Sequence, residues 1–299
     1  MPGFKNVREW PDAEDSGQSW VTGFRKAVPS STTTTSAWAD YSYFSGSPAA
    51  NFYASAPLEA STVEASRGLY VPTVAPARQF VRNLKVMSAA SGATSTANAR
   101  QALILADLLL YYPFIDTDAV GEEQAMVNAV AIPRYDGGQV IAVGQSAGAS
   151  SGRFTFTYTN DAGVPGRVSQ NHFTFATGGG GLVVASSLVG TSSFHPFCHL
   201  QAGDKGVRSI ESVTFTTGGG GLMALVIVKP LMTAHVTQEC RTTTSGNIES
   251  FGACDEFASV ISQAPPRIID GAVLGFFAAG HGGSISSSVL TGIIETTWN

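Results

Sequence analysis

An alternating segment near the middle of the chain is the strongest constraint on its fold. Residues Arg153–Asn160 read Arg-Phe-Thr-Phe-Thr-Tyr-Thr-Asn, with aromatic residues and threonines at successive positions. Successive side chains of a β-strand point to opposite faces, so this pattern is typical of a strand that buries one face. The turn-forming residues Asp161-Ala-Gly-Val-Pro-Gly follow it. We therefore predict a half-buried strand that ends at a turn.

The remainder of the C-terminal two thirds continues this pattern, because short apolar stretches alternate with glycine-rich turns. Many short strands with such turns indicate a mainly β chain, either a β-sandwich or a jelly-roll-like domain, with one or two short helices. We expect further strands at Gln139–Val143, His172–Thr177, Leu182–Ser187, Ser209–Thr216, Leu222–Val228, Arg267–Ile269, Val273–Ala278 and Gly292–Trp298.

One segment favours a helix. Residues Ala97–Tyr112 are rich in Ala and Leu and contain no glycine. Residues Thr94–Thr96 can cap its first turn, and Pro113 would end it. Since the segment is apolar nearly all round, we predict a buried helix near residues 97–112. A second, shorter helix is predicted at Gly121–Asn128.

The first 95 residues differ from the β-rich body, which we place at residues 96–299. They hold three of the four tryptophans, and the run Ser30–Ser36 contains only Ser and Thr. We expect an extended, irregular region with short strands at Gly68–Val71 and Gln79–Val86. This region either folds as a layer onto the body or forms an arm that reaches a neighbouring chain. Its candidate interface residues are Trp10, Trp20, Trp38, Phe52 and Tyr53.

Composition excludes several classes of protein. Charged residues make up only 13% of the 299 positions, against ~25% in an ordinary domain. A hydrophobic content of 43% argues against disorder, and a net charge of −5 gives no reason for direct nucleic-acid binding. The longest apolar run, Ala102–Tyr112, contains Asp107 and is far shorter than the ~20 residues that span a bilayer. We expect no membrane partner, and the N-terminus lacks the apolar segment of a secretory signal.

Two tetraglycine runs, Gly178–Gly181 and Gly218–Gly221, lie in a repeated phrase. Phe173-Thr-Phe-Ala-Thr-Gly-Gly-Gly-Gly-Leu is echoed by Val213-Thr-Phe-Thr-Thr-Gly-Gly-Gly-Gly-Leu. Each copy reads as strand, turn and strand, which predicts a pair of hairpins. A phosphate-binding loop would need a following Gly-Lys-Ser/Thr and a helix, so phosphate binding is not expected.

The segment Gly144–Gly148 matches the G-x-S-x-G motif of serine hydrolases. Asp255 or Asp270, and then His281, follow Ser146 in the order that these enzymes use. The motif works where a strand turns sharply into a helix, which leaves the serine hydroxyl exposed. Here the chain passes directly into the alternating strand. We therefore interpret the motif as a glycine-rich loop and do not expect an enzyme.

Potential metal ligands gather in His195-Pro-Phe-Cys198-His199. A structural zinc site needs four ligands in paired clusters, and no second pair occurs at short spacing. Cys240 and Cys254 complete a set of three cysteines, too few for a disulfide scaffold; reduced thiols are the default, and a bridge between these two stays open. The acidic segment Asp116–Glu123 fits a helix start. We expect no catalytic residue, metal or cofactor.

Five phrases occur in a fixed order along the body. They are Leu108-Leu-Leu-Tyr-Tyr-Pro-Phe-Ile-Asp116, Ile132-Pro-Arg-Tyr-Asp-Gly-Gly138, Tyr158-Thr-Asn-Asp-Ala-Gly-Val-Pro-Gly-Arg167, Leu200-Gln-Ala-Gly-Asp-Lys-Gly-Val-Arg-Ser-Ile-Glu-Ser-Val213 and Pro266-Arg-Ile-Ile-Asp-Gly-Ala-Val-Leu-Gly-Phe276. This series resembles a family of tailed-bacteriophage virion structural proteins that are described as structural or head-associated. The resemblance covers roughly residues 100 to 299. It implies a non-enzymatic component of the virion, made in the cytoplasm of the bacterial host.

The scarcity of charge fits a subunit with extensive protein contacts, because charged residues are depleted in interface cores. The leading hypothesis is a capsid decoration or cement protein, homo-oligomeric, that binds the major capsid protein or tail proteins. The alternative within the particle is a tail, neck or baseplate component. Two alternatives from other classes are a serine hydrolase that uses Ser146 and a carbohydrate- or receptor-binding module.

Overall fold

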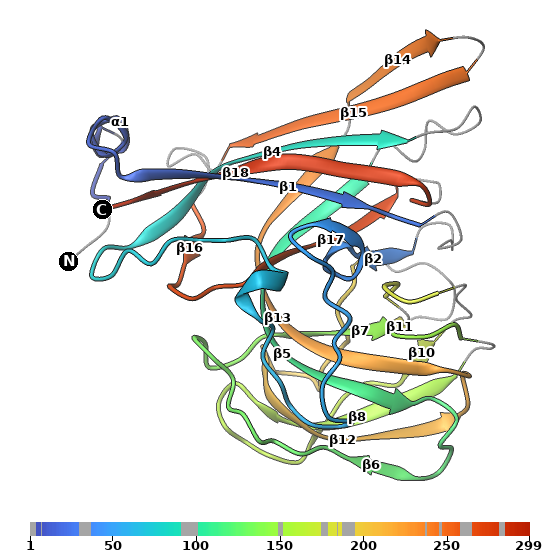
Figure 1. Ribbon diagram of the computed structural model, residues 1–299. Helices are drawn as coiled ribbons and strands as arrows, with labels where there is room; N and C mark the ends of the chain where they lie inside the picture. The colour runs from blue at the N-terminus through green and yellow to red at the C-terminus, as the bar shows by residue number, and fades with distance from the viewer. Residues whose placement is uncertain are drawn as a thin grey trace.

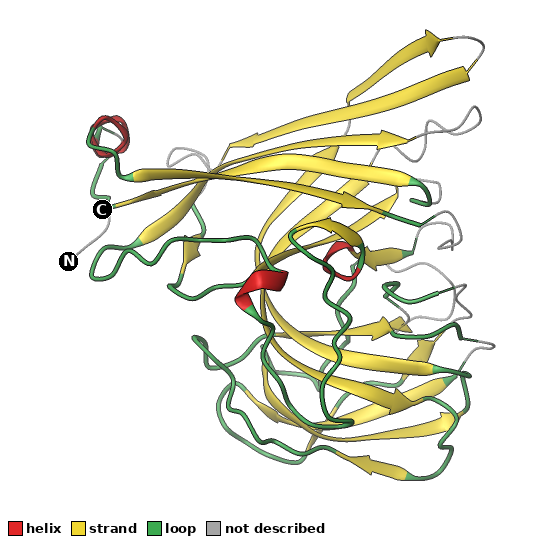
Figure 2. Ribbon diagram, in the orientation of Figure 1, coloured by secondary structure: helices red, strands yellow, loops and turns green. Residues whose placement is uncertain are grey.

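Antiparallel strands make up most of the chain, as the alternating segments predict. The structure, a computed structural model, describes residues 4–6, 8–29, 37–90, 101–148, 152–174, 179–183, 185–186, 195–236, 238–244, 247–257, 265–280 and 285–299. In these residues it contains eighteen strands, the α-helix α1 (Glu9–Asp15) and the short 3-10 helices η1 (Tyr41–Tyr43) and η2 (Ala65–Arg67). The prediction of a mainly β, sandwich-like chain is confirmed (Figure 2).

The strands form three antiparallel sheets, which we call upper, middle and lower from their places in Figure 1. The upper sheet has the order β14 (Gln238–Thr244), β15 (Asn247–Phe257), β4 (Gln79–Ala90), β18 (Ser288–Trp298), β1 (Ser19–Ala27) and β3 (Ser45–Ser47), with β16 (Arg267–Ile268) beside β4. The middle sheet has the order β2 (Trp38–Asp40), β17 (Leu274–Gly280), β5 (Gln101–Asp116), β13 (Leu222–Val236) and β7 (Gln139–Gly144). The lower sheet has the order β11 (Ala185–Ser186), β10 (His172–Thr174), β8 (Arg153–Asn160), β12 (Val207–Thr217) and β6 (Glu123–Ala125), with β9 (Arg167–Val168) beside β8.

The middle sheet carries buried apolar residues on both of its faces. Leu105 belongs to a large cluster that includes Leu84 of the upper sheet and Phe154 of the lower sheet. Its neighbour Ile104 points to the opposite face and joins a second cluster. Tyr53, from the irregular chain between β3 and β4, covers that second cluster. The core is therefore shared by all three sheets and by an irregular N-terminal segment.

The predicted helix near residues 97–112 is wrong. Residues 97–100 lie outside the described part, and from residue 101 the chain forms β5, which pairs with β13 on one side and β17 on the other. Because both edges and both faces of β5 are covered, nearly every one of its positions is apolar and no period of two is visible. Packing overrides the helical preference of Ala and Leu.

The second predicted helix, Gly121–Asn128, is also wrong. Residues Glu123–Ala125 form the edge strand β6, and Gly121 has a left-handed φ of 77° that no helix accommodates. The α-helix of the described chain, α1, instead lies in the N-terminal region that we expected to be irregular. It has seven residues, and among the described residues no helix is long and apolar enough to cross a membrane.

Most of the expected strands are present with changed lengths. Strand β8 has the predicted bounds, and β4, β7, β12, β13 and β18 contain the predicted segments or nearly so. Strand β17 begins at Leu274, one residue after the expected start. The segment Gly68–Val71 makes only an isolated bridge between Leu69 and Leu274.

The two tetraglycine runs differ in structure. Strands β10 and β11 flank the first run and pair antiparallel, as a hairpin predicts, although residues 175–178 lie outside the described part. The second run, Gly218–Gly221, is not a hairpin turn, because β12 belongs to the lower sheet and β13 to the middle sheet. Both edges of β13 are already paired with β5 and β7, so β12 has no free edge there. The second run is therefore a crossover between sheets.

The described part of residues 1–95 is built into the same sheets as the body. Strand β1 lies between β18 and β3, β2 pairs with β17, and β4 lies between β15 and β18. The described strands of residues 1–95 therefore share sheets with strands of residues 96–299. The two chain ends lie side by side, where Asn299 Nδ2 donates to Glu9 Oε2 at 3.3 Å (Figure 1).

Candidate functional site

The five aromatic residues proposed for an interface separate into two groups. Trp10, Trp38 and Tyr53 are buried inside the chain, with 8%, 6% and 0% of their surface exposed. Trp20 and Phe52 are exposed by 44% and 54%. Only these last two can contact another molecule without unfolding of the chain.

Trp20 forms an exposed aromatic pair with Tyr70. Their ring centroids lie 5.9 Å apart in an edge-to-face arrangement, and Tyr70 is 60% exposed. Aromatic side chains supply much of the binding energy in protein interfaces, so two such rings at one place are a candidate contact. Tyr70 was not among the sequence candidates, although it lies in a segment that we expected to form a strand.

Phe52 lies in a segment that we call the aromatic strap, residues 41–53. Its ring packs edge to face against Tyr43, with centroids 5.1 Å apart. The Tyr43 hydroxyl donates to the carbonyl oxygen of Gln145 at 3.1 Å. Gly180 lies so close that a Cβ atom there would be 2.5 Å from the same hydroxyl. The first tetraglycine run thus lacks side chains where the strap packs against it.

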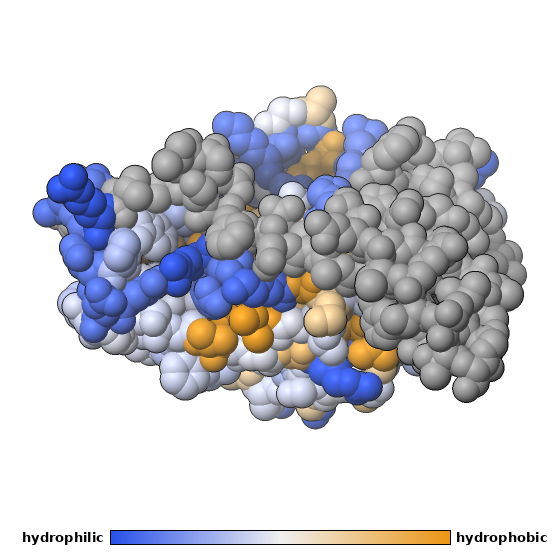
Figure 3. Space-filling model, turned by 90° about the horizontal axis from the view of Figure 1, so that it is seen from above, coloured by the Kyte–Doolittle hydropathy of each residue, from blue (hydrophilic) through white to orange (hydrophobic). Residues whose placement is uncertain are grey.

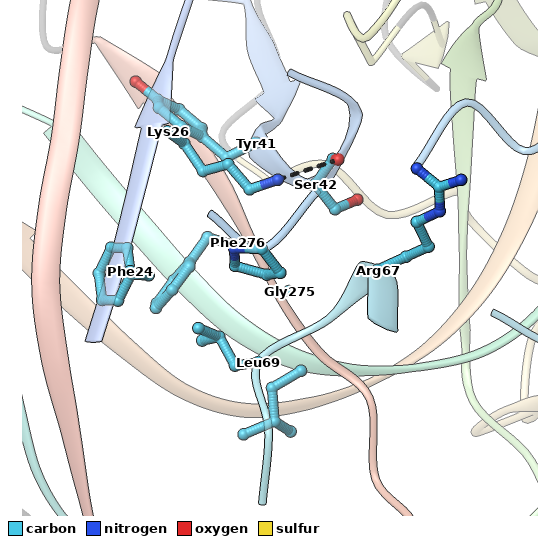
Figure 4. Close-up of a pocket in the computed structure, with 10 residues that line it drawn as sticks. Phe24, Lys26, Tyr41, Ser42, Arg67, Leu69, Gly275 and Phe276 are labelled. Carbon is cyan, nitrogen blue, oxygen red and sulfur yellow. Dashed lines mark hydrogen bonds between the residues drawn. The ribbon is translucent and has the colours of Figure 1, made fainter. Parts of the chain in front are cut away.

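A buried lysine fastens the backbone of the strap. Lys26 is only 3% exposed, and its Nζ donates to the carbonyl oxygens of Ser42, Phe44 and Ala49 at 3.4, 3.2 and 3.4 Å. Figure 4 shows the ammonium group reaching the Ser42 carbonyl. Burial lowers the pKa of Lys26 to about 8, while nearby Asp40 favours the charged form. An ammonium has three donors, so these carbonyls use all of them.

A buried carboxylate fastens the two ends of the strap. Asp40 is fully buried and accepts from the Ser42 backbone N–H at 2.8 Å, the Ser42 hydroxyl at 2.5 Å and the Tyr53 hydroxyl. Burial raises the pKa of Asp40, and these hydrogen bonds oppose that rise. Tyr53 has a left-handed φ of 52°, so its backbone bends sharply where its hydroxyl is held.

Two further side chains hold the strap from outside. Arg67 Nη1 donates to the Ala50 carbonyl at 2.7 Å. Gln145 Nε2 donates to the carbonyls of Phe52 and Tyr53 at 3.2 and 3.1 Å. Phe52 is therefore exposed on a backbone that is restrained on both sides. This rigidity reduces the ordering cost when its ring binds a partner.

The cavity beside the strap is too small for a ligand. It has a volume of about 10 Å³ and is lined by residues that include Phe24, Lys26, Tyr41, Leu69 and Phe276 (Figure 4). A volume of that size holds one water molecule at most. The buried charges here consequently act on the fold of the strap.

Ser146, the serine of the G-x-S-x-G motif, makes a structural contact in the described residues. Ser146 Oγ accepts the backbone N–H of Leu222 at 2.8 Å and so ties the end of β7 to the crossover. Asp270 accepts the backbone N–H groups of Val74 and Ala75 at 3.2 and 3.0 Å. His281 and the side chain of Asp255 lie outside the described part.

The acidic segment at Asp116–Glu123 forms a turn. Asp118 donates its backbone N–H to Asp116 Oδ1 at 2.8 Å, and its own Oδ1 accepts the N–H of Gly220 at 2.9 Å. Among the described residues, no three His, Cys, Asp or Glu side chains come together to hold a metal ion. These carboxylates order the turn beside the crossover.

The histidine cluster lines a shallow depression of about 420 Å³ that is formed by residues 195–204 and Gln139. The rings of His195 and His199 lie 5.0 Å apart between centroids. Cys198 points inward, is buried, and has its pKa raised to about 12 by that burial. The group of potential ligands is thus split, with the two imidazoles at the depression and the thiol in the core.

Asp204 holds the C-terminal end of the segment 195–204 in place. It accepts from Arg167 Nε at 2.9 Å, from the Tyr158 hydroxyl at 2.6 Å and from Asn160 Nδ2 at 2.9 Å. The hydrogen bond from Arg167, followed by those from Tyr158 and Asn160, lowers the pKa of Asp204 to about 2. The backbone N–H of Gln201 donates to the same tyrosine hydroxyl at 2.9 Å.

Asp204 and its three side-chain partners form one clamp, by which we mean a carboxylate that fastens a loop to a strand. A second clamp, around Asp107, lies within the middle sheet. Asp107 is fully buried and accepts from Arg134 Nε at 2.9 Å, Arg134 Nη2 at 2.7 Å and the Val273 N–H at 3.0 Å. Burial raises the pKa of Asp107, and the Arg134 contacts oppose that rise. The bidentate pair fastens the loop after β6 to the centre of β5.

Sequence reasoning missed the buried groups that hold the strap, Lys26, Asp40 and Arg67. For Lys26 a signal was available, because it lies two residues after Phe24 on the same strand face.

Comparison with protein-family models, curated proteins and solved structures found no match to this chain. Function must therefore be argued from the chain itself.

Proposed function

We propose that this protein is a structural subunit of a tailed-bacteriophage particle, namely a capsid decoration or cement subunit that binds neighbouring subunits. The five phrases that resemble virion structural proteins support this proposal. Apart from Asp107, they supply the residues of the two clamps. Arg134 and Val273 come from two of these phrases and meet at Asp107, which directly precedes a third.

The clamp at Asp204 is also built from residues of these phrases. Tyr158 and Arg167 come from one phrase, and Asp204 comes from another. The phrases thus include residues that fasten loops to strands, and in the described residues they contain no nucleophile paired with a base. A resemblance of this kind favours a structural role over catalysis. This convergence is the observation that carries the proposal.

The contact with a neighbour is assigned to Phe52 on the aromatic strap, with the Trp20–Tyr70 pair as a second contact. Figure 3 shows the molecule from above, where the coloured apolar residues occur in small groups among hydrophilic ones. Binding through a few rigid aromatic anchors suits such a surface better than one broad apolar face. The partners are the major capsid protein or tail proteins, together with further copies of this chain.

The first experiment is electron microscopy of purified particles, with the copy number measured by quantitative mass spectrometry. A decoration subunit is expected on the shell in hundreds of copies. Six or twelve copies at the tail or neck would instead support the alternative structural role. Absence of the protein from the particles would overturn both.

The second experiment measures binding of the full-length protein to particles that lack it. We expect Phe52→Ser to weaken binding about tenfold or more, the effect of losing one interface anchor. Val168→Ser is the matched control, because Val168 is also exposed, by 47%, and lies on the lower sheet. Equal binding of the two variants would contradict the role of the strap. Binding of the wild-type protein to isolated host glycans would support the receptor-binding alternative.

A further inference from the structure

Three histidines meet at the segment 195–204, which we call the histidine segment. The chain has five histidines in all. His195 and His199 lie in the segment, and His172 lies below it on β10. His172 is fully buried, with its ring stacked on Phe156 at 5.6 Å between centroids. This cluster of three histidines belongs neither to the aromatic strap nor to the two clamps.

Two of the three rings accept hydrogen bonds from the backbone of the segment. His172 Nε2 accepts the N–H of His199 at 2.9 Å, and His195 Nδ1 accepts the N–H of Phe197 at 3.2 Å. A ring nitrogen accepts a hydrogen bond only when it carries no proton. Both histidines must therefore be neutral, and the proton of neutral His172 lies on Nδ1.

The surroundings of His172 give no compensation for a positive charge. From β8 it meets the rings of Phe154 and Phe156, and from the histidine segment it meets His199. Arg153, the cation next along β8, lies over the ring of Phe173. Within the described residues, His172 Nδ1 has no hydrogen-bond partner and His172 forms no ion pair with a carboxylate. Burial, with a smaller contribution from His199, lowers the pKa of His172 to about 4.

We propose that the histidine segment is a latch that acid opens by protonating His172 and His195. A proton added to His172 Nε2 turns the acceptor into a donor that faces the N–H of His199, so that hydrogen bond breaks. A proton on His195 Nδ1 breaks the bond from Phe197 in the same way. The charge of His199, whose ring lies 5.0 Å from that of His195 between centroids, opposes a positive charge on His195 and favours separation of the two rings.

Opening is confined to the N-terminal half of the segment. The other half is held by Asp204, which stays ionised in mild acid and keeps its bonds to Arg167, Tyr158 and Asn160. Cys198 lies between the two released amides and is buried in the closed form. Its N–H donates to the Val140 carbonyl at 2.8 Å, and the backbone of Ala142 hydrogen-bonds to its thiol. Opening of the latch therefore exposes the Cys198 thiol.

The experiment measures the labelling rate of Cys198 in the full-length protein with 4,4′-dithiodipyridine, a disulfide reagent that reacts with thiols in acid. Peptide mass spectrometry assigns the label to Cys198, and a small thiol measured at each pH corrects for reagent reactivity. We expect the corrected rate to rise about tenfold or more between about pH 7.5 and about pH 4.5, as the unprotonated acceptors are lost. Far-UV circular dichroism, recorded in parallel, should stay unchanged.

Variants separate the latch from general acid sensitivity. Glutamine has an amide oxygen that can accept the His199 N–H but does not titrate, so His172→Gln should reduce the acid-induced rise in the labelling rate of Cys198 to the part that His195 contributes. His235→Gln, at a histidine of β13 outside the cluster, should keep the full acid response. If His172→Gln fails to fold, His199→Gln serves instead, and it should move the midpoint to lower pH by removing one of the repelling rings.

Three results would overturn the latch. One is a corrected rate that does not rise in the wild-type protein. Another is an unchanged response in His172→Gln, or an unchanged midpoint in His199→Gln. The third is a loss of circular dichroism with the same midpoint as the labelling, which would mean that acid unfolds the whole chain. None of these measurements depends on binding to a particle.

Discussion

Single buried charges decide the conformation of the aromatic strap. Lys26 and Asp40 do not form a direct ion pair in the structure; each instead binds groups of the strap. Lys26 takes three carbonyl oxygens and Asp40 takes the amide and hydroxyl of Ser42. A buried polar group that loses its partner costs stability, so these residues should contribute more than exposed charges do.

Lys26→Met tests this at the residue scale. The variant keeps an apolar stem of similar length but leaves three carbonyls without their donor and Asp40 without the nearby positive charge. We expect the free energy of unfolding to fall by about 2–4 kcal/mol, measured by urea denaturation. Lys85→Met is the control, because the Lys85 side chain is 45% exposed and pairs with Glu295 at the surface. Its loss should stay below about 1 kcal/mol, and an equal loss in both variants would contradict the role given to Lys26.

At the scale of elements, two similar ten-residue phrases lie between differently arranged strands. The phrase that begins at Phe173 lies between β10 and β11, which pair with each other. The phrase that begins at Val213 connects β12 of the lower sheet to β13 of the middle sheet. The difference lies in the neighbours of the following strand, because β13 is already paired on both sides. The glycines of the two runs are consequently under different constraints.

Gly221→Ala and Gly179→Ala test these constraints. Gly221 has a left-handed φ of 86°, and a Cβ atom there would lie 2.4 Å from the Ala147 carbonyl oxygen. Gly179 has no atom within 4 Å of the corresponding position. We expect Gly221→Ala to lower the unfolding free energy by about 2 kcal/mol or more, and Gly179→Ala to change it by less than about 0.5 kcal/mol. Thermal denaturation of the two variants measures both, and similar melting temperatures would refute the difference.

At the scale of the whole molecule, buried tyrosines make the stability of the protein depend on pH in the alkaline range. Burial raises the pKa of Tyr41, Tyr112 and Tyr135 to about 12, against an ordinary value of 10.0. The unfolded chain therefore releases these protons first as the pH rises. Stability is unaffected by them well below pH 10 and falls as the pH climbs toward 12.

The expected size of this fall can be stated. Between about pH 9 and about pH 11 the three tyrosines together remove about 4 kcal/mol of unfolding free energy. Lys26 acts in the opposite direction, because its lowered pKa makes the unfolded chain the better proton binder, and restores about 2 kcal/mol. Burial also raises the pKa of Tyr158 to about 12 and that of Tyr53 well above its ordinary value, so urea denaturation at both pH values should show a net loss of at least about 2 kcal/mol. Tyr112→Phe should reduce the pH-dependent loss by about 1 kcal/mol, and complete ionisation at 295 nm in the folded protein near pH 10.5 would contradict the prediction.

The amino-acid sequence by itself determined the fold class and many of the strands. Period-two alternation and turn residues act over a few positions, which is why β8 was predicted with its correct bounds. The interpretation of the Ser146 motif as a loop also came from local order, since strand β8 follows where the hydrolase motif requires a helix. The interface candidates were only partly informative, because composition alone does not distinguish exposed Phe52 from buried Tyr53.

Only the tertiary structure decided the features that depend on distant neighbours. Strand β5 is apolar throughout because other elements cover its edges and faces, and an isolated apolar segment looks the same whether it is a helix or a buried strand. The second tetraglycine run became a crossover because β13 already had two partners. The Lys26–strap contacts and the meeting of His172 with His199 join residues far apart in the chain. Such contacts arise from packing of the sheets, and no local pattern encodes them.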